Sequence, residues 1–320
     1  MTRRGKNIIR CIYGAVLTIS IFAGIANADI VDDTYIKLNG LGLFTSNNNY
    51  LQTGWYDMDG GRVGDDIDID NANFVGSYYF GEKGDILRPF VQGGFGFSKI
   101  EQNNVNLGRG TRDDIELDSQ YIKIGAGLNY NPTQEMGFVV GVSSLWMESD
   151  SDYKSAVTLA ATPLDNKIRR VFEDDSSNTI YDIYAGAVYH PSIYGYDTHF
   201  DLTLHYLNMD FDHGYGNRDG ISADLSAGVY THELTRLADL PIRAHLYVSA
   251  TLLDDELSDT VGFDNAFSAG ISILWKVGPV IHIFDDAFKD TELSFNLQGT
   301  TGDNDFKGVK ASVSFCIAKF

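Results

Sequence analysis

The stretch "YIKIGAGLNY", residues 121–130, alternates apolar with polar or small side chains along its whole length. One face carries every second residue: Ile122, Ile124, Ala126, Leu128 and Tyr130. The other face carries Tyr121, Lys123, Gly125, Gly127 and Asn129. Because successive side chains of a β-strand point to opposite sides of the sheet, this spacing predicts a strand with one apolar and one polar face.

The same period of two recurs along the chain, and we expect twelve strands. Most of them approach the length of about 9–11 residues that a tilted strand needs to cross a bilayer. The connection 277–290 contains the apolar stretch VIHIF, which fits either a short extra strand or a turn of helix. The predicted strands are residues 34–44, 72–80, 88–100, 119–130, 135–147, 178–190, 198–209, 220–231, 241–253, 265–276, 291–299 and 308–320.

Two further features favour a membrane barrel over a soluble β-sandwich. Aromatic residues end the apolar faces, where a membrane protein places its interfacial girdles: Tyr181, Tyr189, Phe200, Tyr206, Phe267 and Trp275. The connections after odd-numbered strands, such as 101–118 and 148–177, are long and acidic, whereas those after most even-numbered strands, such as 131–134, are shorter. Since every backbone group must be paired in lipid, we predict an all-β, closed antiparallel barrel with long outer loops and short periplasmic turns.

The N-terminus predicts export. Arg3, Arg4, Lys6 and Arg10 precede an apolar core at residues 11–25, and "ANA", residues 26–28, offers a small-residue cleavage site. We therefore expect a signal peptide over 1–28, cleaved near Ala28, and one barrel domain over 29–320.

The composition of the exported chain excludes several classes of function. Cleavage removes four basic residues and no acidic ones, so the net charge becomes (24 − 4) − 44 = −24. A chain this acidic is a poor binder of nucleic acid. Only Cys316 remains, so the exported chain has no internal disulfide.

At this point the sequence resembles bacterial outer-membrane β-barrels, through its export signal, its alternating strands and its terminal Phe320. In that family the last strand and its aromatic end are read by the barrel-assembly machinery. In the family pattern the terminal aromatic lies on the same face as the lipid-facing residues of the last strand. Phe320 departs from this pattern, because the alternation places it on the face of Ser314 and Cys316 and not on the face of Val313 and Phe315. A bulge near the end, or an atypical terminal signal, would account for this phase.

The size and strand number resemble the translocator barrel of autotransporters. That resemblance implies a monomer in the outer membrane, in contact with lipid and lipopolysaccharide. An autotransporter carries a passenger and a pore helix before its barrel. Here about five residues separate Asp29 from the first predicted strand, so we expect neither a passenger nor a pore helix.

Charged residues on the polar faces are expected to project into the lumen. On neighbouring strands, which lie about 4.8 Å apart, they can form one network. Either the network selects solutes by charge, or it fills a narrow barrel structurally, because buried charges need partners. These residues are Lys123, Asp182, Asp201, His205, Asp224, Arg243, His245, Glu292 and Lys310.

Two outer segments are further candidates. Residues 153–172 have helical spacing and a basic end, and are expected to form either a lumen plug or, as we favour, an outer-loop helix. The run "DDIDIDN", residues 65–71, places Asp66, Asp68 and Asp70 on one face. These carboxylates suit calcium, but the run lacks the glycine and distal glutamate of an EF-hand, so a solvated strand extension is the favoured interpretation.

The sequence predicts no enzyme and no cofactor. No Gly-x-Ser-x-Gly, phosphate loop or Cys/His metal pattern occurs, and no His-x-Ser stretch suggests a membrane phospholipase. We therefore expect a membrane-embedded barrel with a passive or structural role, or a narrow solute pore. The alternative is an adhesin-like surface protein that acts through its acidic loops.

Overall fold

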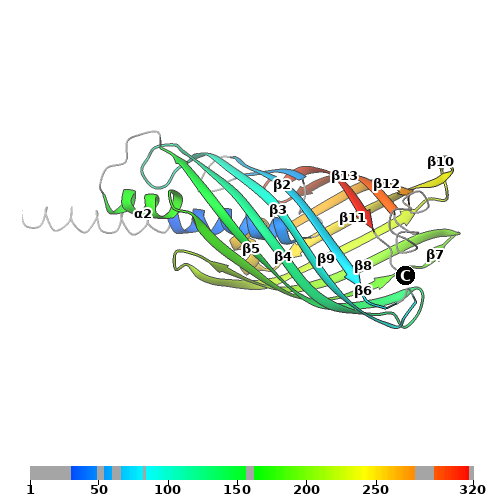
Figure 1. Ribbon diagram of the computed structural model, residues 1–320. Helices are drawn as coiled ribbons and strands as arrows, with labels where there is room; N and C mark the ends of the chain where they lie inside the picture. Colours follow the sequence, from blue (N-terminus) through cyan, green and yellow to red (C-terminus); the bar gives the residue numbers. More distant parts are fainter. Residues whose placement is uncertain are drawn as a thin grey trace, which may run out of the picture.

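The structure is a computed structural model in which most residues belong to one sheet that closes on itself (Figure 1). The predicted signal peptide, the stretch VIHIF and Phe320 lie outside the described residues. The structure describes residues 30–48, 54–59, 66–81, 84–155, 162–277 and 292–316.

The predicted closed antiparallel barrel is confirmed. Neighbouring strands pair in antiparallel fashion, and β14 pairs with β1 to close the ring. Two short strands, β7 (Ser192–Ile193) and β10 (Thr235–Leu237), extend two of the connections. The twelve strands of the barrel wall are β1 (Gly54–Asp59), β2 (Asp66–Tyr79), β3 (Leu87–Val105), β4 (Asp113–Tyr130), β5 (Met136–Lys154), β6 (Ser176–Tyr189), β8 (Tyr196–Phe211), β9 (Gly216–Tyr230), β11 (Leu240–Leu253), β12 (Asn265–Lys276), β13 (Glu292–Gly302) and β14 (Lys307–Cys316).

The two ends of the barrel differ. One end carries the helices α2 (Pro163–Phe172) and α3 (Asp255–Val261) in the connections after β5 and β11, and we call it the α2 end. The opposite end carries β7 and β10, and we call it the β10 end (Figure 1). Within the described residues, no helix is long and apolar enough to cross a membrane.

The first predicted strand is wrong, because residues 30–47 form a helix that lies inside the barrel (Figure 1). Val31, Tyr35 and Leu38 recur at helical spacing and are at most 1 % exposed. A segment in the lumen has no neighbouring strand, so only a helix can satisfy its own backbone groups. The absence of a pore helix was therefore also a wrong prediction. Strand β1 takes the missing place, within a region expected as connection 45–71.

Along β2 to β6 and β8 the apolar residues change sides while the alternation itself continues. In β4, Ile122 and Ile124 point outward and are 60 % and 53 % exposed, as predicted for lipid contact. Closer to the α2 end, Ile115 and Leu117 of the same strand point inward and are buried, and the alternate positions are acidic. The barrel therefore has an apolar outer band toward its β10 end and a water-exposed half with an apolar interior at its α2 end.

The seam between β1 and β14 depends on a glycine. Tyr56 pairs with Gly308 across the seam, and its ring is stacked on Phe306 at a centroid distance of 5.4 Å. A Cβ atom at Gly308 would lie 2.3 Å from Cδ1 of Tyr56 and 2.5 Å from the carbonyl oxygen of Trp55. The missing side chain thus allows the Tyr56 ring to lie against the wall where the barrel closes.

We expect Gly308→Ala to destabilise the barrel by about 1–3 kcal/mol, because the added methyl group overpacks the seam. Gly299→Ala is the matched control, since a Cβ atom there meets nothing within 4 Å. Urea unfolding in detergent, followed by tryptophan fluorescence, measures both variants. Equal stabilities of the two variants would contradict this account of the seam.

Candidate functional site

The lumen is filled at the α2 end by the helix of residues 30–47. Every residue from 38 to 47 is buried, and Leu38, Leu41 and Phe44 are at most 1 % exposed. Gly40 allows close approach to α3, because a Cβ atom there would lie 2.7 Å from Cγ2 of Thr260. The barrel contributes inward apolar residues around the helix, among them Met58, Ile67, Ile69, Ile100, Leu145, Leu207, Met209 and Phe263.

Polar side chains of the wall hold the C-terminal end of this helix. Lys123 Nζ donates to the carbonyl oxygen of Asn47 at 3.0 Å. This ammonium group complements the partial negative charge at a helix C-terminus. Asn47 Nδ2 donates to Asp182 Oδ2 at 3.2 Å, and Asn48 Nδ2 donates to Asp224 Oδ1 at 3.1 Å. The helix end is therefore fixed by three contacts to the wall.

His205 joins the two carboxylates. Its Nδ1 lies 3.0 Å from Asp182 Oδ1, and its Nε2 lies 3.4 Å from Asp224 Oδ2. Thr251 Oγ1 donates to Asp224 Oδ1 at 2.6 Å. Asp182, His205 and Asp224 lie on β6, β8 and β9, which are neighbours in the sheet, as the sequence pattern placed them. We call Lys123, Asp182, His205 and Asp224 the lumen latch; all four are buried.

The remaining predicted lumen residues lie apart from the latch. Asp201 accepts a hydrogen bond from Ser226 at 2.9 Å, and the Arg243 guanidinium lies 5.7 Å from the Tyr230 ring centroid. His245 contacts His199 nearer the β10 end. Lys310 is half-buried on β14. Glu292 begins β13, and its side chain is outside the described part of the chain.

The N-terminal end of the lumen helix lies at the opening of the barrel at its α2 end, which we call the mouth. Asp32 accepts from Lys167 Nζ of α2 and from the Tyr215 hydroxyl, each at 2.5 Å. Burial and the hydrogen bond to Asp32 raise the pKa of Tyr215 above its usual range. Tyr35 stacks on Tyr215 at 4.8 Å and faces Phe172 of α2 at 6.4 Å. The plug is therefore the helix of residues 30–47, and α2 packs over it at the mouth, within the segment 153–172.

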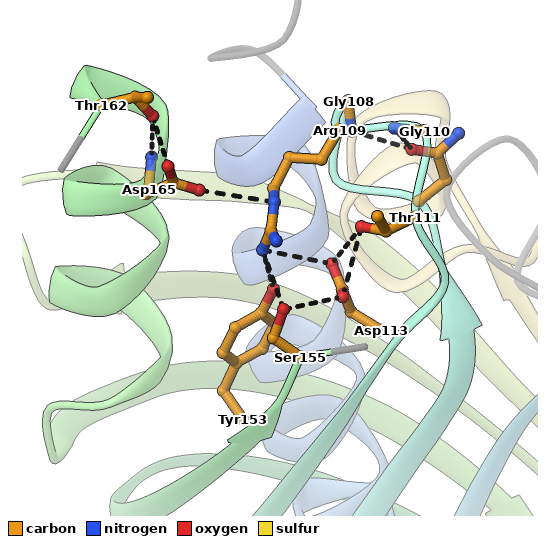
Figure 2. Close-up of polar contacts among 10 residues, drawn as sticks. Gly108, Arg109, Gly110, Thr111, Asp113, Tyr153, Ser155, Thr162 and Asp165 are labelled. Carbon is orange, nitrogen blue, oxygen red and sulfur yellow. Dashed lines mark hydrogen bonds and ion pairs between the residues drawn. The ribbon is translucent and has the colours of Figure 1, made fainter. Parts of the chain in front are cut away.

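A second polar cluster, which the sequence did not predict, fastens α2 (Figure 2). Arg109, in the connection between β3 and β4, donates to the Tyr153 hydroxyl at 2.8 Å and to Ser155 Oγ at 3.1 Å. Its Nε lies 3.4 Å from Asp165 of α2, and Nη1 lies 3.7 Å from Asp113. We call Arg109, Asp113 and Asp165 the mouth latch; their side chains are at most 8 % exposed.

Part of this cluster has a recognisable sequence signal. Thr162 caps α2 by accepting from the Asp165 backbone N–H at 3.1 Å, and Pro163 follows at the start of the helix. A threonine followed by proline is typical of a helix N-terminus and predicts where α2 begins. Arg109 carries no such signal, since it is a lone arginine in a glycine-containing loop.

The described acidic side chains of the run 65–71 lie on the outer face of the barrel. Asp68 and Asp70 are exposed on the outward face of β2, and Asp70 pairs in register with Lys99 of β3. The side chain of Asp66 is outside the described part of the chain. The two described carboxylates thus lie on a strand that extends into solvent.

Known proteins similar to this chain include a membrane domain and the β-domain of an autotransporter. Residues 27–162, less than half of the chain, match the model of the OprF membrane domain family. No curated protein matches the chain. The β-domain of the Bordetella autotransporter BrkA has a similar structure, with a TM-score of 0.50 at 8 % sequence identity, over 82 % of this chain and 93 % of that one.

Two other translocators are similar at slightly lower scores. The translocator domain of NalP from Neisseria meningitidis gives a TM-score of 0.49 at 10 % identity, over 82 % of this chain and 86 % of that one. The transport unit of AIDA-I from Escherichia coli gives 0.49 at 8 % identity, over 87 % and 98 %. The chain is a closed antiparallel β-barrel whose fold is similar to that of the BrkA autotransporter β-domain.

Proposed function

We propose that the protein is a self-closed outer-membrane barrel with a structural role at the cell surface and without a catalytic role. One observation carries this proposal: the helix of residues 30–47 occupies the lumen, with its apolar side chains buried against the wall. A lumen filled in this way leaves little room for solute, which favours the structural role over an open pore. The lumen latch holds the C-terminal end of the plug, and Asp32 holds its N-terminal end through Lys167 and Tyr215.

We further propose that the α2 end faces the cell exterior. Outward side chains at this end of β4 are charged, as Asp114, Glu116 and Asp118 illustrate, which suits water and not lipid. The N-terminal end of the plug lies at the same end, so a chain cleaved near Ala28 would begin at the cell surface. Insertion as a monomer by the barrel-assembly machinery completes the proposal.

Conductance tests the closed state. We expect the refolded exported chain, residues 29–320, to give no stable single-channel current in a planar bilayer. Deletion of residues 30–47 is expected to give discrete current steps, because it removes the side chains that fill the lumen. A heat-modifiable band on a gel confirms that the variant is folded. Steps from the wild-type barrel as large as those from the deletion variant would contradict the proposal.

A second candidate is a surface interaction protein, and the acidic exterior of the α2 end favours it. Exposed carboxylates there include Asp68, Asp70, Asp118, Glu148, Asp150 and Asp175. Such a surface attracts cationic partners, and salt screens the attraction. Binding of cells to a cationic surface, compared before and after replacement of these residues by Asn or Gln, separates this role from a purely structural one.

A further inference from the structure

Two histidines from strands that are not neighbours meet inside the lumen near the β10 end. His199 lies on β8 and His245 on β11, with β9 between them. His199 Nδ1 lies 3.3 Å from His245 Nε2, with a centroid distance of 4.8 Å between the rings. They meet over Gly228, where a Cβ atom would lie 2.4 Å from Cε1 of His199 and 2.5 Å from Nε2 of His245. The glycine therefore makes room for both rings.

Both rings are held in place by other groups. His245 is stacked between Tyr230, at 4.2 Å, and Tyr247, at 5.2 Å, with interplanar angles of 12° and 21°. His199 turns its second nitrogen, Nε2, toward Asp201 Oδ2 at 3.6 Å. This is an ion-pair distance, longer than a hydrogen bond, and it places Asp201 on the side of the ring from which a carboxylate supports a metal-bound imidazole.

The geometry points to a zinc site, and we propose that His199 Nδ1 and His245 Nε2 bind one Zn²⁺ with Asp201 as a positioning residue. Two nitrogens that bind Zn²⁺ tetrahedrally at about 2.0–2.1 Å lie roughly 3.3–3.4 Å apart, which matches the observed separation. Imidazole nitrogens suit zinc, whereas calcium prefers oxygen ligands.

Water supplies the other two zinc ligands. Within the described part of the chain, no three or more His, Cys, Asp or Glu side chains group around one metal position, so the described residues supply two ligands. His199 is buried, but His245 is only half-buried, so solvent reaches the His245 side of the pair. The site binds a divalent metal ion without being needed for closure of the barrel, because the lumen helix is held by other residues.

Calorimetric titration of the refolded, untagged barrel with ZnCl₂ tests the site. We expect one Zn²⁺ per barrel, with no detectable binding after His199→Gln or His245→Gln. Asp201→Asn is expected to bind about 10–100-fold more weakly, because the ligand ring loses its supporting carboxylate. His232→Gln, which changes an exposed histidine in the connection between β9 and β11, is the matched control and is expected to bind like the wild type. CaCl₂ is expected to give no signal.

A second measurement needs no variant. Zinc is expected to protect His245 of the wild-type barrel from diethyl pyrocarbonate, as read by mass spectrometry, while His232 reacts as before. No zinc binding by the wild type, unchanged affinity in both histidine variants, or equal modification of His245 with and without zinc would overturn the proposal. Each of these outcomes would mean that the two rings share only a hydrogen bond.

Discussion

Replacement of Arg109 by methionine is expected to destabilise the barrel by about 3–5 kcal/mol and to release α2 from the mouth. The Arg109 side chain is 8 % exposed, and it lies beside the carboxylates of Asp113 and Asp165, which are 0 % and 8 % exposed. Methionine fills similar space but leaves both carboxylates buried without their cation. The cost is large because each buried carboxylate then keeps only uncharged hydrogen-bond donors, such as Ser155 for Asp113 and Thr162 for Asp165, in place of its cation.

Limited proteolysis and urea unfolding measure this effect. We expect faster cleavage within residues 155–175 and a lower unfolding midpoint for Arg109→Met. Arg236→Met is the matched control, because Arg236 of β10 is 60 % exposed and pairs with Glu233 at the surface, so its loss should change little. Unchanged proteolysis of Arg109→Met would show that apolar packing alone holds α2.

Asp182→Ala is the second substitution with a large expected effect, and it acts at the C-terminal end of the helix 30–47. Asp182 is 3 % exposed and accepts from Asn47 Nδ2, and its carboxylate also contacts His205. Its removal leaves His205 and Lys123 with one carboxylate fewer in a buried network. We expect a loss of about 3–5 kcal/mol, because one member of a buried charge group is deleted.

The same variant should also loosen the plug. Bilayer recordings of Asp182→Ala are expected to show intermittent current steps that the wild type lacks, as the C-terminal end of the helix leaves the wall. Asp68→Ala is the control, since Asp68 is exposed on the outer face of β2. If Asp182→Ala unfolds at the same urea concentration as Asp68→Ala, the lumen latch does not hold the helix.

The sequence predicts the strands well because their environment is regular. Lipid on one side and a polar lumen on the other impose a strict alternation, as residues 121–130 illustrate. Asp182, His205 and Asp224 could be placed together for the same reason, since parity and strand order fix which side chains are neighbours. Arg109 could not, because a loop has no periodicity to fix its position.

Residues 34–44 show why the plug was missed. Val31, Tyr35 and Leu38 fit helical spacing over the longer stretch 30–47, yet the shorter window reads as an alternating strand. Only the tertiary setting decides between the two, because a segment enclosed by a finished sheet has no strand partner. Strand β1 was missed because Gly54–Asp59 is short and lies beside an acidic segment.

The sequence also did not show that the apolar residues face inward at the α2 end, and the cause is related. Ile115 and Ile122 of β4 are both apolar, but one faces the plug and the other faces outward. Sequence alternation reports which residues share a face and not which solvent that face meets. The position of the bilayer along the barrel therefore came only from the exposure of the side chains.

Cysteine labelling tests most directly whether the helix lies inside the barrel. In a Cys316→Ser background of the refolded chain 29–320, one variant carries Leu38→Cys, at a position 1 % exposed, and the other carries Asp68→Cys, at an exposed position. With a hydrophilic maleimide, we predict rapid labelling of Asp68→Cys and labelling of Leu38→Cys only after unfolding in urea. Equal labelling rates in the folded barrel would contradict the plugged lumen.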